Sequence, residues 1–420
     1  MRVHWIWLHH RPGLSDRDKK TLLDHFRDPE AVYYADSELF SHLNLRPEAR
    51  DALCDKNLAS SEKILAQCME KHISILTCQD ALYPACLKNT ADPPLVLYYK
   101  GQLPDFDANP VIAVVGTRRA SAYGLTMAKR MGYQIAQGGG IVVSGLASGI
   151  DAMAMSGALS GGSMAVGVLG CGVDVVYPQR NAALYRDTQR YGCILSEFAP
   201  GDAPAGWHFP KRNRIISGLS NGVLVVEAPE KSGALITANL AAEQGRDVFA
   251  IPGNIDMPSF VGSNRLLRDG AMMVSSGWDI LREYEGLYPD KIRRDESPSR
   301  QTLSPEEAGL AREAERAPEA KVAQKSIRPA GRENLKKELD HKAIDKEPKA
   351  DYHDVNKSLP ALNADEQAIL NALAGSERLV DEVIAETGLS TGKLLAALTM
   401  LELKGMITRL PGKRIAPRGR

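Results

Sequence analysis

The chain contains few of the residue patterns that indicate metal, disulfide or membrane chemistry. Its 420 residues include only six cysteines, none of which forms a Cys-x-x-Cys pair, and no Cys/His cluster has zinc-site spacing. This usage is typical of reduced thiols in a cytosolic protein, and we expect no metal site. No apolar run has membrane length, and the first ten residues are too short and too polar at their end for a signal peptide. We therefore expect a soluble, cytoplasmic protein.

The sequence also lacks an excess of charge of either sign. Lys plus Arg and Asp plus Glu each number 52, so the formal net charge is zero. Without a global positive field, any site for nucleic acid must be a local one. The length favours two or three domains over one, and the hydrophobic share of 44% is sufficient for a sizeable core.

Common catalytic and nucleotide-binding motifs are missing as well. No GxxxxGK[ST] motif is present, which excludes a P-loop ATPase. The three glycines at 138–140 precede an expected strand, which is the wrong context for a dinucleotide fingerprint. No Ser/His/Asp set stands out, and His208 is better explained as a surface or packing residue. The sequence therefore predicts no catalytic residue and no cofactor.

Four segments differ in composition. Residues 1–100 are mostly helical by pattern and add an extra strand or two to the next segment. Residues 101–287 alternate strands with helices, which predicts an α/β fold with a doubly wound parallel sheet. Residues 288–358 carry dense charge of both signs and few aromatics, which indicates a disordered linker. Residues 359–420 show three helices and a hairpin, the pattern of a winged helix.

The strands of the central segment set the position of a candidate site. The first, residues 111–115, is an unbroken apolar run, which indicates a strand buried on both faces. Further strands are expected at 141–143, 165–169, 193–195, 223–226, 247–251 and 272–274. Ligands of open α/β sheets bind beyond the carboxyl ends of the strands. The polar turns that follow these strands are therefore the candidate site.

The first two turns offer donors for a phosphate. A glycine turn after the first strand brings N–H groups, a hydroxyl and two guanidiniums, those of Arg118 and Arg119, together. Residues 143–151 also follow a strand and open a helix, which Asp151 is expected to cap. Both turns are equally consistent with purely structural βα connections. The candidate residues are Gly116, Thr117, Arg118, Ser144 and Gly145.

The third turn, residues 207–216, begins a helix and is rich in cations. Cations are unfavourable at the positive N-terminal end of a helix, so a bound polyanion explains them better than helix stability does. The rings of Trp207 and Phe209 offer surfaces on which bases can stack. The alternative is a solvated basic turn with Phe209 in the core. The candidate residues are Phe209, Lys211, Arg212, Asn213 and Arg214, and we expect the cations to converge with Arg118 in one crevice.

A fourth turn follows the strand at 223–226 and completes the expected edge. Its candidate residues are Ser232, Gly233 and Thr237, which carry polar groups toward the same end of the sheet. Glu227 lies just before this turn and is either a catalytic carboxylate or a group that orients arginines. The second role is favoured because arginines are numerous nearby.

These turns, in this order, resemble the DNA-processing protein A family (DprA/Smf). The most specific runs are Phe-Pro-Lys-Arg-Asn-Arg-Ile-Ile at 209–216 and Ser-Gly-Ala-Leu-Ile-Thr-Ala at 232–238. The resemblance implies a Rossmann-like central domain that binds single-stranded DNA, a homodimer through that domain, and the RecA recombinase as a partner in natural transformation. It also implies a sterile-alpha-motif-like (SAM-like) N-terminal domain and a C-terminal winged helix. Ser148 and Met155 depart from the usual Arg and His of the family, which removes one possible phosphate contact.

We expect a non-enzymatic single-strand DNA-binding protein, and two alternatives remain open. One is an enzyme that cleaves nucleoside monophosphates on a related fold, for which residues 232–237 are only a loose analogue of the required turn. The other is a winged-helix regulator of duplex DNA. Its expected third helix, residues 391–405, carries Lys393 but is otherwise apolar and small, so it is poorly suited to reading bases. The wing tip offers Lys413, Arg414, Arg418 and Arg420 for phosphate contacts instead.

Overall fold

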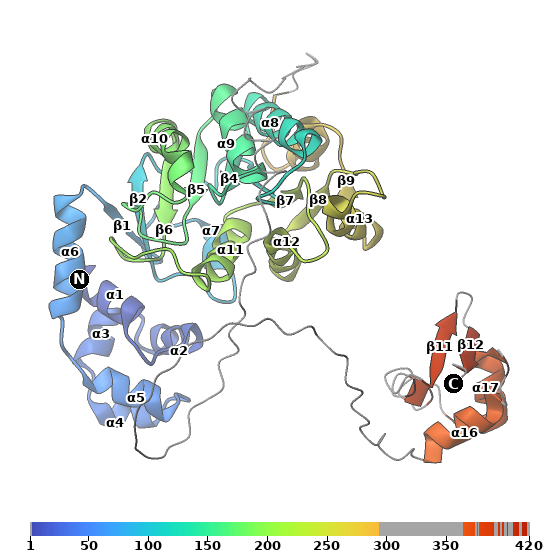
Figure 1. Ribbon diagram of the computed structural model, residues 1–420. Coiled ribbons are helices and arrows are strands. Elements are labelled where there is room, and N and C mark those ends of the chain that lie inside the picture. Colours follow the sequence, from blue (N-terminus) through green and yellow to red (C-terminus); the bar gives the residue numbers. More distant parts are fainter. Residues whose placement is uncertain are drawn as a thin grey trace, which may run out of the picture. The chain divides into compact units, whose positions relative to one another are not determined.

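The structure is a computed structural model of the chain. It describes residues 2–293, 364–373, 376, 378–389, 394, 397–398, 401, 406–410 and 414–417 (Figure 1). The chain divides into two compact units, Met1–Ala323 and Gln324–Arg420. None of the helices in these described ranges is both long and apolar enough to span a membrane.

The first unit begins with helices that pack into one cluster. They are α1 (Arg2–His10), α2 (Asp16–Phe26), α3 (Pro29–Tyr34), α4 (Ser37–Ser41), α5 (Pro47–Cys54) and α6 (Ala59–Glu70). A capping box begins α2, since Ser15 and Asp18 satisfy each other's backbone N–H groups. Helix α1 has buried aromatic and aliphatic side chains, among them Trp5, Ile6 and Trp7.

A nine-stranded sheet forms the body of the first unit. Its strands are β1 (Ser74–Thr77), β2 (Val96–Gly101), β3 (Val111–Val115), β4 (Ile141–Ser144), β5 (Ala165–Val168), β6 (Cys193–Ser196), β7 (Gly222–Val225), β8 (Asp247–Ala250) and β9 (Met272–Met273). Their order is β1-β2-β6-β5-β4-β3-β7-β8-β9. The pairs from β6 to β9 are parallel, whereas β1 and β2 are antiparallel additions at one edge. This confirms the predicted doubly wound sheet, in which β3 and β7 lie at the switch in strand order.

Helices cover both faces of the sheet (Figure 1). One layer holds α8 (Ala122–Gln137), α9 (Ile150–Ser160), α10 (Ala182–Tyr191) and α14 (Gly277–Leu281). The other holds α7 (Ala85–Lys88), α11 (His208–Gly218) and α12 (Gly233–Glu243), while α13 (Val261–Arg268) packs near β8. Helices α8 and α9 lie very close together because Gly132 has no side chain to meet the backbone oxygen of Ala154.

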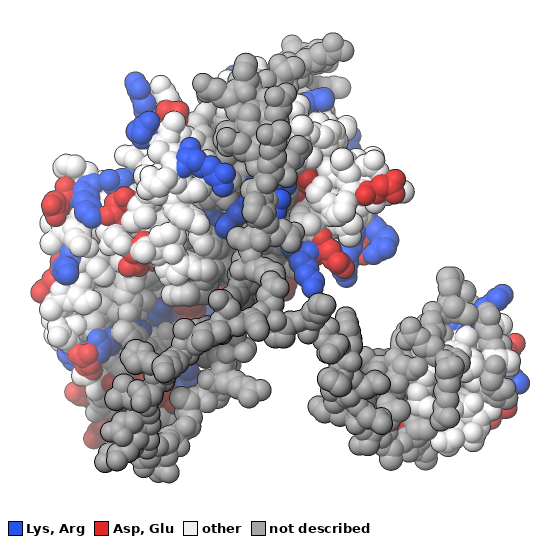
Figure 2. All heavy atoms as spheres, in the orientation of Figure 1, with Lys and Arg blue, Asp and Glu red and all other residues white. Residues whose placement is uncertain are grey.

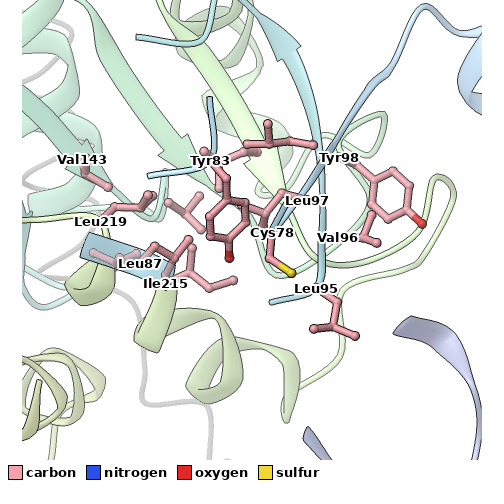
Figure 3. Close-up of a cluster of buried hydrophobic side chains, with 14 of the residues drawn as sticks. Cys78, Tyr83, Leu87, Leu95, Val96, Leu97, Tyr98, Val143, Ile215 and Leu219 are labelled. Atoms are coloured by element: carbon pink, nitrogen blue, oxygen red, sulfur yellow. The ribbon is translucent and has the colours of Figure 1, made fainter. Parts of the chain in front are cut away.

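One hydrophobic core joins the N-terminal helices to the sheet. It extends from Trp5 and Trp7 of α1 to Ala238 and Ala241 of α12. Figure 3 shows its centre, where Tyr83 and Leu97 meet Ile215 of α11. Helix α11 is therefore anchored by its apolar side between the two parts of the unit.

The start of the expected linker belongs to the first unit. Ile292 is buried, and the Arg293 N–H group donates a hydrogen bond of 3.0 Å to the Gly138 carbonyl. The prediction that disorder begins at residue 288 is thus wrong for residues 288–293, because one apolar side chain docks against the body. Residues 294–358 of the predicted linker lie outside the described residues.

The second unit has its own small core. Its elements are α16 (Ala364–Leu373), β10 (Arg378–Leu379), α17 (Val380–Thr387), β11 (Ile407–Leu410) and β12 (Arg414–Pro417). The strands form an antiparallel sheet in the order β10-β12-β11, over buried side chains that include Ile369, Val383 and Ile415. Most of the expected helix at 391–405, including Lys393, and Lys413, Arg418 and Arg420 of the wing tip lie outside the described residues.

Candidate nucleic-acid interface

A pocket lies beyond the carboxyl ends of β3, β4 and β5. We call it the basic pocket, and its charged and aromatic lining residues are Arg118, Arg180, Arg212, Tyr177 and Phe209. The remaining lining is small or apolar, and no carboxylate is among the described residues that form the wall. Three cations around one concavity without a lining acid create a site suited to an anion.

Arg118 lies at the rim of the basic pocket. The backbone before it is fixed because the Thr117 N–H group donates to the Glu227 carbonyl at 2.8 Å. The exposed guanidinium of Arg118 lies 4.9 Å from the centre of the Phe209 ring, a cation–π contact. No carboxylate within residues 2–293 forms an ion pair with Arg118.

Arg212 lies at the base of the pocket and is almost fully buried, with 4% of its surface exposed. Its Nη1 donates to the carbonyl oxygens of Gly145, at 3.0 Å, and Val168, and so it links the carboxyl ends of β4 and β5. Burial lowers the pKa of Arg212 to about 10, although nearby Asp151 favours the charged form. Arg212 therefore stays charged at neutral pH and is a buried wall of the site rather than a solvated side chain.

The loop after β4 differs from its prediction at two positions. Asp151 does not cap α9, because Gly149 occupies the N-cap position with a positive φ of 81°. A side chain at Gly149 would collide with the Thr117 carbonyl. The carboxylate of Asp151 instead accepts a hydrogen bond of 3.1 Å from the Gly145 N–H group, and burial raises the pKa of Asp151. Ser144 is fully buried and donates to the Val114 carbonyl at 2.6 Å, so its hydroxyl is not available to a ligand.

Lys211 and Arg214 lie on a different face of α11. Lys211 pairs with Glu197 at 2.6 Å, and Arg214 pairs with the other oxygen of the same carboxylate. Arg214 also pairs with Asp92 at 3.2 Å. The prediction that Lys211 converges with Arg118 in one crevice is wrong, because successive helical residues point about 100° apart.

The helical repeat separates the α11 residues into two sets. Phe209 and Arg212 are three positions apart and share the face toward the basic pocket. Lys211 and Arg214 have the same spacing and share the face toward Glu197. We call the second set, together with Glu197, the helical junction, because it lies where the N-terminal helices meet the sheet.

The fourth turn forms a structural network beside the pocket. Ser232 caps α12 by accepting a hydrogen bond from the Ala234 N–H group, and Asn213 donates to the Gly233 carbonyl at 3.3 Å. Thr237 is buried and donates to the same carbonyl. These residues do not line the basic pocket.

Two other predicted residues also have structural contacts. Glu227 is fully buried, and its carboxylate accepts hydrogen bonds from the N–H group and the hydroxyl of Ser121, the N-cap of α8. Gly116 is close to Ile150, where no Cβ would fit. Both positions shape the strand end that presents Arg118.

The sequence did not single out Tyr177 and Arg180 as site residues, although both line the basic pocket. They flank the start of a short helix, η1 (Gln179–Asn181), in the connection between β5 and α10. The glycines of this connection, Gly170 and Gly172, come directly after β5, whereas Tyr177 and Arg180 lie further along it. The remaining signal was the placement of an aromatic residue and an arginine after a buried strand.

The fold and the pocket define a Rossmann-like α/β protein with a basic site at the carboxyl edge of its sheet. A family model described as DNA recombination-mediator protein A matches residues 74–285, and one described as DprA winged helix domain matches residues 355–413. DNA processing protein DprA of Bacillus subtilis is 41% identical over 221 residues, which cover 53% of this chain and 74% of that protein. Protein Smf of Synechocystis is 31% identical over 422 residues, 98% of each chain.

A solved structure agrees with these sequence matches. The X-ray structure of DNA processing protein A from Streptococcus pneumoniae has a TM-score of 0.54 and 34% identity, and it covers 67% of this chain and 98% of that one. The chain therefore belongs to the DprA/Smf family of DNA processing proteins. The predicted family, the Rossmann-like fold and the C-terminal winged helix are confirmed.

Proposed function

We propose that this protein binds single-stranded DNA, with little sequence preference, in the basic pocket. The observation that carries the proposal is the combination of three arginines and two aromatic rings in one concavity without a lining carboxylate. Cations that track phosphates and rings that stack on bases are the features of sequence-tolerant single-strand sites. DNA processing by relatives such as the B. subtilis protein supports the same choice of ligand.

The charge distribution favours a local site over a broad basic surface. Figure 2 shows basic and acidic side chains interspersed on the visible face of the first unit, in agreement with the zero net charge. Arg118 and Arg212 are close enough that Arg118 lowers the pKa of Arg212, after the larger effect of burial. A phosphate between them relieves this repulsion.

The family resemblance extends the proposal to partners. We propose that the bound single strand is passed to the RecA recombinase, and that the protein acts as a homodimer through its Rossmann-like domain. The wall of the pocket offers no carboxylate for acid–base chemistry among the described residues, which favours binding over cleavage of nucleoside monophosphates.

A comparison of two cations on this chain tests the site. Binding of a fluorescent oligo-dT to the Arg118→Ala and Lys211→Ala variants is measured by anisotropy across a range of salt concentrations. Arg118→Ala is expected to weaken binding roughly 10- to 100-fold, the loss of one charge-assisted hydrogen bond. It should also make the slope of log affinity against log salt shallower by about 0.7. Lys211→Ala should leave the slope unchanged, since Glu197 already neutralises that cation.

The outcomes separate the proposal from its alternatives. If folded Arg118→Ala keeps both the affinity and the salt slope, the basic pocket is not the DNA site. Release of free base from nucleoside monophosphates would favour the enzyme. A preference for duplex over single strand in competition would favour the duplex regulator.

A further inference from the structure

We infer that Tyr177 and Arg180 complete a nucleotide subsite in the basic pocket, in which one base stacks on Tyr177 and Arg180 contacts a neighbouring phosphate. This inference rests on the proposed single-strand function and assigns two further residues to it. Both residues line the pocket and both are exposed at its rim.

The segment that carries these residues is held in place. The Asn181 side chain donates hydrogen bonds to the carbonyl oxygens of Leu146, at 2.9 Å, and Ala147, at 3.2 Å, in the loop after β4. Gln179 donates to the Val176 carbonyl at 3.1 Å. The start of η1 is thereby fixed against the same loop that supplies Gly145 to the pocket, so the ring and the guanidinium have defined positions.

Tyr177 offers a more open ring than Phe209. Phe209 is half-buried, carries the Arg118 guanidinium over its ring, and packs so closely that a Cβ at Gly170 would lie 2.9 Å from it. The Tyr177 ring leans on Phe209 with a centroid distance of 5.7 Å and an interplanar angle of 30°, and it remains 39% exposed. Phe209 therefore supports Tyr177 from beneath, and the incoming base meets the tyrosine.

Arg180 is the second outward-facing cation of the pocket. It is exposed, and no carboxylate of residues 2–293 pairs with it. Arg212, by contrast, is committed to the carbonyl oxygens at the ends of β4 and β5. Arg118 and Arg180 are thus the two guanidiniums of the pocket lining that are free to neutralise phosphates.

The experiment separates base contacts from phosphate contacts by using two probes. One is a fluorescent oligo-dT, and the other is a strand of equal length in which abasic sites replace the nucleotides. The variants are Tyr177→Ala, Tyr177→Phe and Arg180→Ala in the full chain, with thermal midpoints as the check on folding. The matched controls are Tyr191→Ala and Arg190→Ala, an exposed pair on α10 with its own cation–π contact at 5.3 Å and no place in the pocket lining.

Tyr177→Ala is expected to bind oligo-dT roughly 5- to 150-fold more weakly, the loss of one stacked base, with an unchanged salt slope. Its affinity for the abasic strand should equal that of the wild type, and Tyr177→Phe should retain binding to both probes. Arg180→Ala should lower the affinity for both probes and make the slope of log affinity against log salt shallower by about 0.7. The two control variants should match the wild type.

Each contrary result has a distinct meaning. The stacking assignment is overturned if Tyr177→Ala loses affinity equally for both probes, or if it loses none for oligo-dT. An unchanged slope for Arg180→Ala overturns the phosphate assignment. If Arg118→Ala also leaves binding intact, the proposed function fails; if Arg118→Ala behaves as expected, only the present inference fails.

Discussion

Helix α11 contributes residues to both the basic pocket and the helical junction, but the cations of the two regions differ in their partners. In the pocket, Arg118 and Arg180 have no carboxylate partner within residues 2–293. In the junction, Lys211 and Arg214 share the carboxylate of Glu197, which is only 2% exposed. The difference lies in the partners and not in the residue types.

The comparison shows how a helix with adjacent cations serves two purposes. A buried cation requires a fixed partner, because an unpaired charge in the interior is very costly. The junction meets this need with a carboxylate from the end of β6, and it thereby attaches the N-terminal helices to the sheet. In the pocket, carbonyl oxygens satisfy the buried Arg212, and the exposed Arg118 and Arg180 are left for a ligand. Each change below alters one of the two regions, and the expected effect on stability or on oligo-dT affinity differs between them.

The largest effect is expected from Glu197→Ala, which breaks the junction. It leaves Arg214 buried with Asp92 as its remaining ion-pair partner and removes the nearer of the two carboxylate partners of Lys211. Loss of one member of a buried ion pair should lower the free energy of unfolding by about 3–5 kcal/mol, as measured in urea. Glu230→Ala, at an exposed site, should stay within about 0.5 kcal/mol of the wild type. A loss below about 1 kcal/mol for Glu197→Ala would mean that the junction is not held by this carboxylate.

Acid should weaken the junction and spare the pocket. Burial, with Lys19 and Lys211 nearby, lowers the pKa of His10 from 6.5 to about 4, and burial lowers the pKa of His9 as well. The folded state holds these rings neutral while the unfolded chain protonates them near pH 6.5, so the unfolded state binds more protons. Stability present above pH 6.5 is therefore lost as the pH falls toward 4, by on the order of 1–3 kcal/mol.

A histidine variant isolates this effect from that of the carboxylates. The unfolding free energy of His10→Gln should fall less steeply than that of the wild type between pH 7 and pH 5. Over the same range the affinity for oligo-dT should change little, because the arginines of the pocket stay charged. Identical pH profiles for the two proteins would exclude His10 as a contributor.

The sequence located the elements of both regions accurately. The apolar run expected at 111–115 matches β3 residue for residue, since it is determined by local periodicity and by Pro110 and Gly116 at its ends. It also located four residues that meet in the pocket: Arg118, Gly145, Phe209 and Arg212.

What the sequence could not give was the direction of each side chain on α11. Lys211 and Arg212 are neighbours in the chain, and only the rotation of the helix against β5 decides which cation enters the pocket. The burial of Ser144 and the position of Asp151 depend likewise on contacts between loops far apart in sequence. Tyr177 and Arg180 were missed because they lie well beyond the end of β5, past the glycines of that connection.

A smaller effect is expected from Gly145→Ala, which disturbs the pocket and leaves the junction intact. A methyl group at this position would collide with the guanidinium of Arg212. Arg212 should move away from the Gly145 carbonyl, and oligo-dT affinity should fall by about 5- to 10-fold, the value of one ordinary hydrogen bond. Gly286→Ala is the matched control, because no atom lies within 4 Å of its added methyl. Unchanged affinity in a folded Gly145→Ala protein would show that the placement of Arg212 does not affect binding.

The smallest effect is expected from removing residues 359–420. This truncation tests whether the basic pocket of the first unit accounts for single-strand binding. Among the described residues of the second unit, Arg378 already pairs with Glu386 at 2.6 Å, so its charge is not available to a phosphate. Its hairpin strands, β11 and β12, hold a small core and present Arg414 at the surface. Truncation should therefore weaken oligo-dT binding less than Arg118→Ala does and reduce the salt slope by no more than about one phosphate contact.

The anisotropy titration is repeated on the truncated chain, with its thermal midpoint as evidence that the first unit stays folded. The first unit is expected to fold because its core is complete without these residues. Loss of all single-strand binding by a folded truncation would move the DNA site from the basic pocket to the winged helix.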